Sequence, residues 1–127
     1  LIGVLIVLPF LTEVDYGPDE NQPEERVVAR IGDAALAAWE QDAIPPDGWQ
    51  VDPDALRLGW RHLIARASEL GPDETVLIVT SNGIARFLPD VVDSAPDGLD
   101  RKLKTGAWGV VELHDGSAHI SAWNVRP

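Results

Sequence analysis

The sequence of 127 residues contains no cysteine and no methionine. Without cysteine the chain has no disulfide, no thiolate nucleophile and no thiolate metal site. This composition fits a reducing compartment, and the cytoplasm is therefore the expected location. Long hydrophobic runs are also lacking: residues 1–10 are almost all apolar, but the acidic stretch that follows makes this segment too short for a membrane span.

Basic residues are scarce. Ten Lys and Arg stand against 21 Asp and Glu, which gives a formal net charge of -11. A field of this sign repels nucleic acid and anionic membranes, so neither is expected as a partner. A small phosphorylated metabolite is compatible with it, because a few oriented backbone N–H groups bind a phosphate locally. The oligomeric state stays open, a homodimer being one option.

Two apolar runs predict buried strands of a mostly parallel sheet. Residues 4–8 form an uninterrupted apolar run before Pro9, and residues 75–80 form a second one, rich in β-branched side chains. A chain that opens inside such a strand is expected to be incomplete at its N-terminus. We therefore expect residues 1–127 to form one partial α/β domain.

The remaining elements are helices and a hairpin. Helical spacing of apolar residues predicts one helix from Pro23 to about Trp39 and another from Pro53 to about residue 70, with Asp52 as its N-cap. A third helix follows Ser81 and should be short or kinked because of Pro89. Two β-like runs, residues 106–113 and 117–125, flank an Asp-Gly pair that favours a hairpin at a sheet edge.

The turn Ser81-Asn82-Gly83 is the first candidate site, because ligands of open α/β sheets bind where strands end. A small polar turn before a helix can hold an anion such as phosphate. The simpler interpretation is that Ser81 only caps the helix. A serine-hydrolase nucleophile elbow is a further alternative, for which Gly83 fits and Val79, in place of a glycine, does not.

Glu13 is the second candidate, because it follows the first strand and should reach the same edge of the sheet as Ser81. A carboxylic acid there could protonate a leaving oxygen. Alternatively, Glu13 and its acidic neighbours form only a solvated loop. Their spacing is not that of a calcium-binding EF-hand loop, so neither a metal nor another cofactor is expected. His62, His114 and His119 are interpreted as surface residues, since none has an acidic or metal-spaced partner nearby in the sequence.

The segment Leu11-Thr-Glu-Val-Asp-Tyr-Gly17, together with residues 75–83, resembles the later portion of the histidine phosphatase superfamily, in its phosphoglycerate-mutase-like branch. The resemblance implies a three-layer α/β/α fold and a phosphomonoester hydrolase or phosphomutase that works through a phosphohistidine. It implies that Glu13 is the catalytic proton donor and that Ser81 takes the place of the second catalytic histidine. Ser81, Asn82 and Gly83 would then hold the phosphoryl group.

One departure from this family is decisive for activity. The Arg-His-Gly triplet that bears the phosphorylated histidine does not occur in the sequence. This chain alone is therefore expected to be inactive, with its catalytic histidine in a segment outside it. The alternative is a non-catalytic binding or interaction module that kept the fold.

Overall fold

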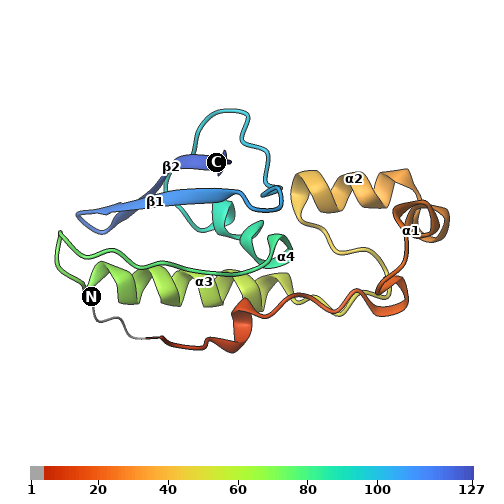
Figure 1. Ribbon diagram of the computed structural model, residues 1–127, viewed down its shortest axis with the longest axis horizontal. Helices are drawn as coiled ribbons and strands as arrows, with labels where there is room; N and C mark the ends of the chain where they lie inside the picture. Colours follow the sequence, from red (N-terminus) through yellow and green to blue (C-terminus); the bar gives the residue numbers. More distant parts are fainter. Residues whose placement is uncertain (1–4) are drawn as a thin grey trace.

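The computed structural model describes residues 5–127. Figure 1 shows their arrangement. The helices are α1 (Glu24–Ile31), α2 (Asp33–Asp42), α3 (Pro53–Ser68) and α4 (Asn82–Ala85), with short 3-10 turns at Pro9–Leu11, Gly17–Asp19 and Leu88–Asp90. The strands are β1 (Trp108–His114) and β2 (Ser117–Val125).

The first helical segment is divided into α1 and α2, whereas the apolar spacing predicted a single helix. Gly32 separates them with φ +88° and ψ 160°, a conformation that ends one helix and lets the next begin in a new direction. Trp39 is the buried residue of α2, and α1 has no buried residue. The apolar spacing predicted helix on both sides of Gly32 but not the change of direction at this glycine.

Helix α3 confirms its prediction at the N-terminal end. The Asp52 carboxylate accepts a hydrogen bond of 3.1 Å from the Ala55 amide, and Pro53 is the first helical residue. Trp60 is its buried residue and donates from Nε1 to the Ile84 carbonyl oxygen at 3.0 Å. This bond ties α3 to α4, which is short and is followed by the 3-10 turn that contains Pro89.

The predicted hairpin is also confirmed. Strands β1 and β2 pair antiparallel, from Trp108 opposite Val125 to His114 opposite Ser117. Asp115 and Gly116 form the turn at φ +49° and +81°, the left-handed values that a two-residue hairpin turn requires. Asp93 and Ser94 lie against the other edge of β2, where the Asp93 amide donates to the Ala118 carbonyl and the Ile120 amide to the Ser94 carbonyl.

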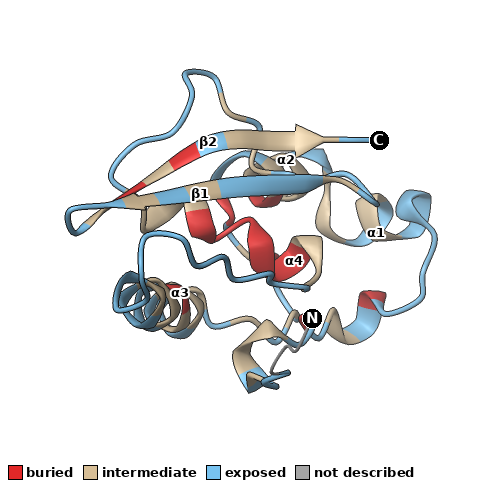
Figure 2. Cartoon of the chain, turned by 60° about the vertical axis from the view of Figure 1, so that its left-hand side comes forward, coloured by how far each residue is buried: buried red, intermediate tan, exposed pale blue. Residues whose placement is uncertain are grey.

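The hydrophobic core is centred on α4 and the turn after it. Figure 2 shows this buried stretch between α3 and the hairpin. Phe87 is fully buried, and Trp39 packs edge-on against it with a ring-centroid distance of 5.9 Å. The buried core cluster consists of Val14, Trp39, Ala43, Trp60, Ile84, Phe87 and Leu88.

The expected central strands are not formed in residues 5–127. Residues 5–8 and 75–80 are extended but pair with no strand, and Leu77 and Val79 are 87% and 81% exposed. A strand exists only with a partner, and the described residues supply none for these two segments. The mostly parallel three-layer sheet is therefore not seen: the architecture is helices with one antiparallel hairpin, and residue 4 of the first predicted strand lies outside the described residues.

None of the helices in residues 5–127 is long and apolar enough to cross a bilayer.

Candidate functional site

The Glu13 carboxylate lies directly against the turn that begins α4. A Cβ atom added to Gly83 would meet Glu13 Oε1 at 2.3 Å, so the carboxylate occupies the space that any other side chain at this position would need. Oε1 also accepts a hydrogen bond of 2.8 Å from the Val14 amide. Because Val14 is buried in the core, the backbone that carries Glu13 is fixed. The structure thus brings together Glu13 and the 81–83 turn, which are far apart in the sequence.

Tyr16 is the second member of this cluster, and the sequence pattern did not single it out. Its hydroxyl lies near the same point, 3.2 Å from the Cβ position of Gly83. Burial raises the pKa of Tyr16 to about 12, and the charge of Glu13 together with a hydrogen bond to that carboxylate adds to the effect. The phenol is therefore a proton donor held next to the carboxylate.

Ser81 does not act as the side-chain cap that the simpler interpretation required. It occupies the N-cap position of α4, but its side chain makes no capping hydrogen bond. Its Oγ is buried, and no group in residues 5–127 pairs with it. A buried hydroxyl without a partner is unusual and leaves a donor and an acceptor free at this turn.

Asn82 and Gly83 have structural tasks in the same turn. Asn82 Oδ1 accepts a hydrogen bond of 2.9 Å from the Leu103 amide, which fixes the loop that leads to β1. Gly83 is buried and provides room for Glu13. In residues 5–127, Ser81 is therefore the residue of the turn whose side chain has a buried polar atom without a hydrogen-bond partner.

Arg86 lies near the cluster formed by Glu13, Tyr16 and the 81–83 turn, and the sequence pattern did not indicate it. It is 2% exposed, and its guanidinium lies 4.1 Å from the centroid of the Trp39 ring. Nη1 donates to the Trp39 carbonyl at 3.0 Å. Burial lowers the pKa of Arg86, with the nearby Tyr16, Glu40, Glu13 and Asp100 opposing that effect. The available signal was its isolation, because it is the sole basic residue between Arg66 and Arg101.

The acidic loop after Glu13 is only partly solvated. Asp19 is buried and accepts hydrogen bonds from Arg30, and Trp49 Nε1 donates to it at 2.8 Å. These bonds lower the pKa of Asp19, that from Arg30 most, although burial opposes them. The interpretation of a purely solvated loop is thus wrong for Asp19, which anchors the loop.

The three histidines lie outside the Glu13 cluster. His62 is exposed on α3 and His114 is exposed at the hairpin turn. His119 is half-buried on β2, with Nδ1 2.5 Å from Ser94 Oγ. Among residues 5–127, no three His, Asp or Glu side chains are grouped as metal ligands.

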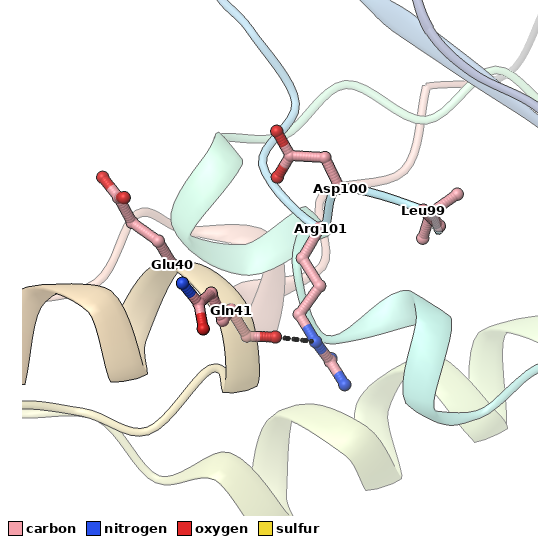
Figure 3. A pocket seen from close by; sticks show the side chains of 5 residues that line it. All are labelled: Glu40, Gln41, Leu99, Asp100 and Arg101. Carbon is pink, nitrogen blue, oxygen red and sulfur yellow. Dashed lines mark hydrogen bonds between the residues drawn. The ribbon is translucent and has the colours of Figure 1, made fainter. Parts of the chain in front are cut away.

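A hollow of about 390 Å³ lies between the end of α2 and the loop at residues 99–101 (Figure 3). Arg101, the cation among the residues that line the hollow, already has hydrogen-bond and ion-pair partners. Nε donates to the Gln41 carbonyl at 2.9 Å, the dashed line in the figure, and Nη2 pairs with Asp90 at 2.6 Å. The hollow therefore offers no free cation to an anionic ligand.

The Glu13 carboxylate and the Tyr16 phenol therefore lie together against the turn that begins α4, and a hydrogen bond joins them. A carboxyl group and a phenol can each give or accept a proton. The model of the histidine phosphatase superfamily (branch 1) matches residues 4–126, and the chain belongs to this superfamily. No curated protein and no solved structure matches the chain significantly.

Proposed function

We propose that this chain carries the proton-donor half of a phosphomonoester hydrolase or phosphomutase site. Membership of the histidine phosphatase superfamily supports a phosphatase or mutase type of function. The observation that carries the proposal is the packing of Glu13 against Gly83, with Tyr16 beside it. In the complete domain the two extended segments would join the parallel sheet of a three-layer fold.

Glu13 would give a proton to the leaving alcohol while a histidine outside residues 1–127 attacks phosphorus. The P–O bond to the alcohol breaks as the N–P bond of a phosphohistidine forms. Water would then release phosphate from that histidine, or an acceptor alcohol would take the phosphoryl group in a mutase. The substrate of this reaction would be a small phosphorylated metabolite, and no cofactor would take part.

Ser81 would hold the phosphoryl oxygens together with backbone N–H groups of Asn82 and Gly83. The support is its buried Oγ, which has no partner in residues 5–127. A serine hydroxyl is a neutral donor, whereas a histidine in that place would make a charge-assisted bond. We therefore expect weaker phosphate binding than in relatives with two histidines, unless a cation outside the described residues compensates.

The test is hydrolysis of p-nitrophenyl phosphate by residues 1–127 and by a version extended upstream in the coding sequence. We expect no turnover above buffer for residues 1–127. For the extended chain we expect turnover that Glu13→Gln lowers by about 10²- to 10⁴-fold in kcat, the usual contribution of a general acid.

The matched control is Glu20→Gln, which removes a carboxylate from the same loop. It should change kcat by no more than about twofold, because the proposal depends on the Glu13 carboxyl group and not on the charge of the loop. Robust turnover by residues 1–127 that survives Glu13→Gln would contradict the proposal.

The runner-up is a non-catalytic binding module, favoured by the absence of the Arg-His-Gly triplet from the sequence. An extended chain that folds, binds phosphate and hydrolyses nothing would support it. The serine-hydrolase alternative needs a base for Ser81, and in residues 5–127 no histidine is bonded to its Oγ. Labelling of the folded chain by a fluorophosphonate probe would be required to sustain that alternative.

A further inference from the structure

Arg86 is a buried cation to which the proposed reaction gives no task. Among residues 5–127, Asp19 and Arg86 are the buried charged residues. Asp19 is paired with Arg30, whereas no carboxylate in the described part of the chain forms an ion pair with Arg86. An arginine is seldom fully buried without such a partner, because its charge loses the hydration that water provides. Other contacts must therefore offset the cost of burying this charge.

Three contacts hold the Arg86 guanidinium beside the first turn of α4. Nε donates to the Asn82 carbonyl at 3.3 Å, and Nη1 donates to the Trp39 carbonyl in the last turn of α2. The face of the Trp39 ring provides the third contact. Figure 1 shows α4 beside the end of α2. Arg86 thus connects α2 to Asn82, the residue that precedes Gly83.

The Glu13 carboxylate and the Tyr16 hydroxyl lie against Gly83, and the charge of Arg86 acts on both. Burial has the largest effect on the pKa of Tyr16 and raises it, while the charge of Arg86 lowers it. Burial lowers the pKa of Arg86 itself, and the charges of Tyr16 and Glu13 are among those that raise it. The guanidinium and the carboxylate therefore interact through space, although no hydrogen bond in residues 5–127 joins them.

We propose that Arg86 is a positioning residue of the Glu13 site, an inference that rests on the proposed function. Through the Asn82 carbonyl it fixes the turn against which the Glu13 carboxylate lies. Its charge stabilises the carboxylate that remains on Glu13 after the proton has passed to the leaving oxygen. Glu13 regains a proton from the water that releases phosphate from the phosphohistidine. The assistance matters most when the leaving alcohol is a strong base.

The first test uses residues 1–127 and does not depend on turnover. The phenolate absorbance of Tyr16 is titrated, with circular dichroism at each pH to confirm the fold. Arg86→Met removes the charge and should move the midpoint to higher pH, whereas Arg86→Lys keeps the charge and should leave the midpoint close to that of the unmodified chain. Arg86→Gln repeats the neutral change with a side chain that can still donate to a carbonyl, so the result does not depend on the folding of one variant.

The second test uses the chain extended upstream and two substrates, p-nitrophenyl phosphate and ethyl phosphate. p-Nitrophenolate leaves as a stable anion, while ethoxide needs a proton, so weaker assistance to Glu13 should slow ethyl phosphate more. We expect Arg86→Met to lower kcat/KM for ethyl phosphate at least about tenfold more than for p-nitrophenyl phosphate, and Arg86→Lys to restore most of that difference. A purely structural defect would lower both values by the same factor.

Arg61→Met is the matched control, because it removes the same charge from an exposed position on α3. It should change neither the Tyr16 midpoint nor the ratio of the two kcat/KM values by more than about twofold.

Two outcomes would overturn the inference alone. One is a Tyr16 midpoint that neither Arg86→Met nor Arg86→Gln moves in the folded chain. The other is an extended chain that turns over but loses the same factor of kcat/KM on both substrates in Arg86→Met. An extended chain without turnover on either substrate would instead overturn the proposed function and the catalytic role of Arg86 with it, while the titration would still show whether Arg86 acts on the Glu13–Tyr16 pair.

Discussion

Gly83 determines where the Glu13 carboxylate lies. Its missing side chain leaves the space that Glu13 Oε1 fills, and the Val14 amide holds that oxygen from the other side. Tyr16 closes the cluster with its hydroxyl. The carboxylate therefore has a defined place although the residue itself is exposed.

Gly83→Ala should displace this carboxylate. The new methyl group would lie 2.3 Å from Glu13 Oε1, which is far inside van der Waals contact. The exposed carboxylate can move away from the methyl group, but Val14 Cγ2, 3.2 Å away in the buried core, has no room to move. We therefore expect a loss of about 1–3 kcal/mol in the free energy of unfolding, measured by urea denaturation. Gly71→Ala is the matched control, since its nearest neighbour would be Glu74 Cγ at 3.8 Å, and it should change stability by less than about 1 kcal/mol. Equal effects of the two variants would contradict the tight contact.

Tyr16 reports on the same cluster, because it is the sole tyrosine of the chain. Phenolate absorbance near 295 nm should titrate with a pKa of about 12. Glu13→Gln removes a negative charge and should lower the pKa of Tyr16 but leave it above 10, because burial is the larger cause. Since the pKa is raised on folding, the stability linked to Tyr16 is present below pH 10 and is lost as the pH rises through 12.

Glu20→Gln is the control for the Tyr16 titration, because Glu20 contributes less to the shift than Glu13 does. The pKa should fall less than in Glu13→Gln. A pKa near 10 in the unmodified chain, or one unchanged by Glu13→Gln, would show that the carboxylate and the phenol do not interact.

Only part of the candidate site could be predicted from the sequence. Glu13 and the 81–83 turn follow apolar runs, and polar groups after strands are visible in a sequence. Tyr16 and Arg86 belong to the site because of contacts that form only on folding. The Tyr16 phenol lies beside the Glu13 carboxylate near Gly83, and the Arg86 guanidinium stacks on the Trp39 ring. No spacing rule encodes such contacts between segments.

At the scale of elements, local signals predicted α3 and the hairpin but missed the break between α1 and α2 at Gly32, and they did not show which strands would find a partner. Helix α3 is specified by Asp52, Pro53 and its own apolar stripe, and the hairpin by Asp115-Gly116. The runs at residues 5–8 and 75–80 have strong strand propensity but lack pairing partners in the described residues. Strand propensity shows that a segment is able to form a strand, but the segment does so only when a neighbouring strand pairs with it.

Trp60 joins two of these elements, and its removal should therefore be costly. It is 2% exposed on α3 and donates to the Ile84 carbonyl at the end of α4. Trp60→Phe removes this bond and leaves a space in the core, although the Phe87 amide still donates to the Ile84 carbonyl at 3.2 Å, and we expect a loss of about 1–3 kcal/mol by urea denaturation. Trp108→Phe, at a residue 46% exposed on β1, should stay within about 0.5 kcal/mol. A loss of the same size in both variants would show that the bond to Ile84 does not matter.

At the scale of the whole molecule, excess negative charge and partly buried ion pairs have opposite effects on stability. A net charge of -11 at pH 7 is self-repelling and should favour expansion, while the isoelectric point of about 4.4 marks where that repulsion vanishes. Asp90 acts in the other direction, since it bridges Arg57 on α3 and Arg101 in the loop before β1. Acidification therefore first relieves repulsion and then removes these bridges.

Stability should accordingly fall steeply as the pH drops below the isoelectric point of about 4.4, where the ion pairs are lost. Burial alone would raise the pKa of Asp90, but hydrogen bonds from Arg101 and Arg57 outweigh it and hold the pKa below the usual 3.8. A carboxylate with a lowered pKa contributes stability above 3.8, and that contribution is lost as the pH falls through its folded pKa. In urea denaturation from about pH 6 to pH 2, Asp90→Asn should be less stable than the unmodified chain at the upper end and converge with it at the lower. Asp97→Asn makes the same change of charge at an exposed residue and should run parallel to the unmodified chain. If Asp90→Asn also ran parallel, the pairs with Arg57 and Arg101 would not be a source of stability.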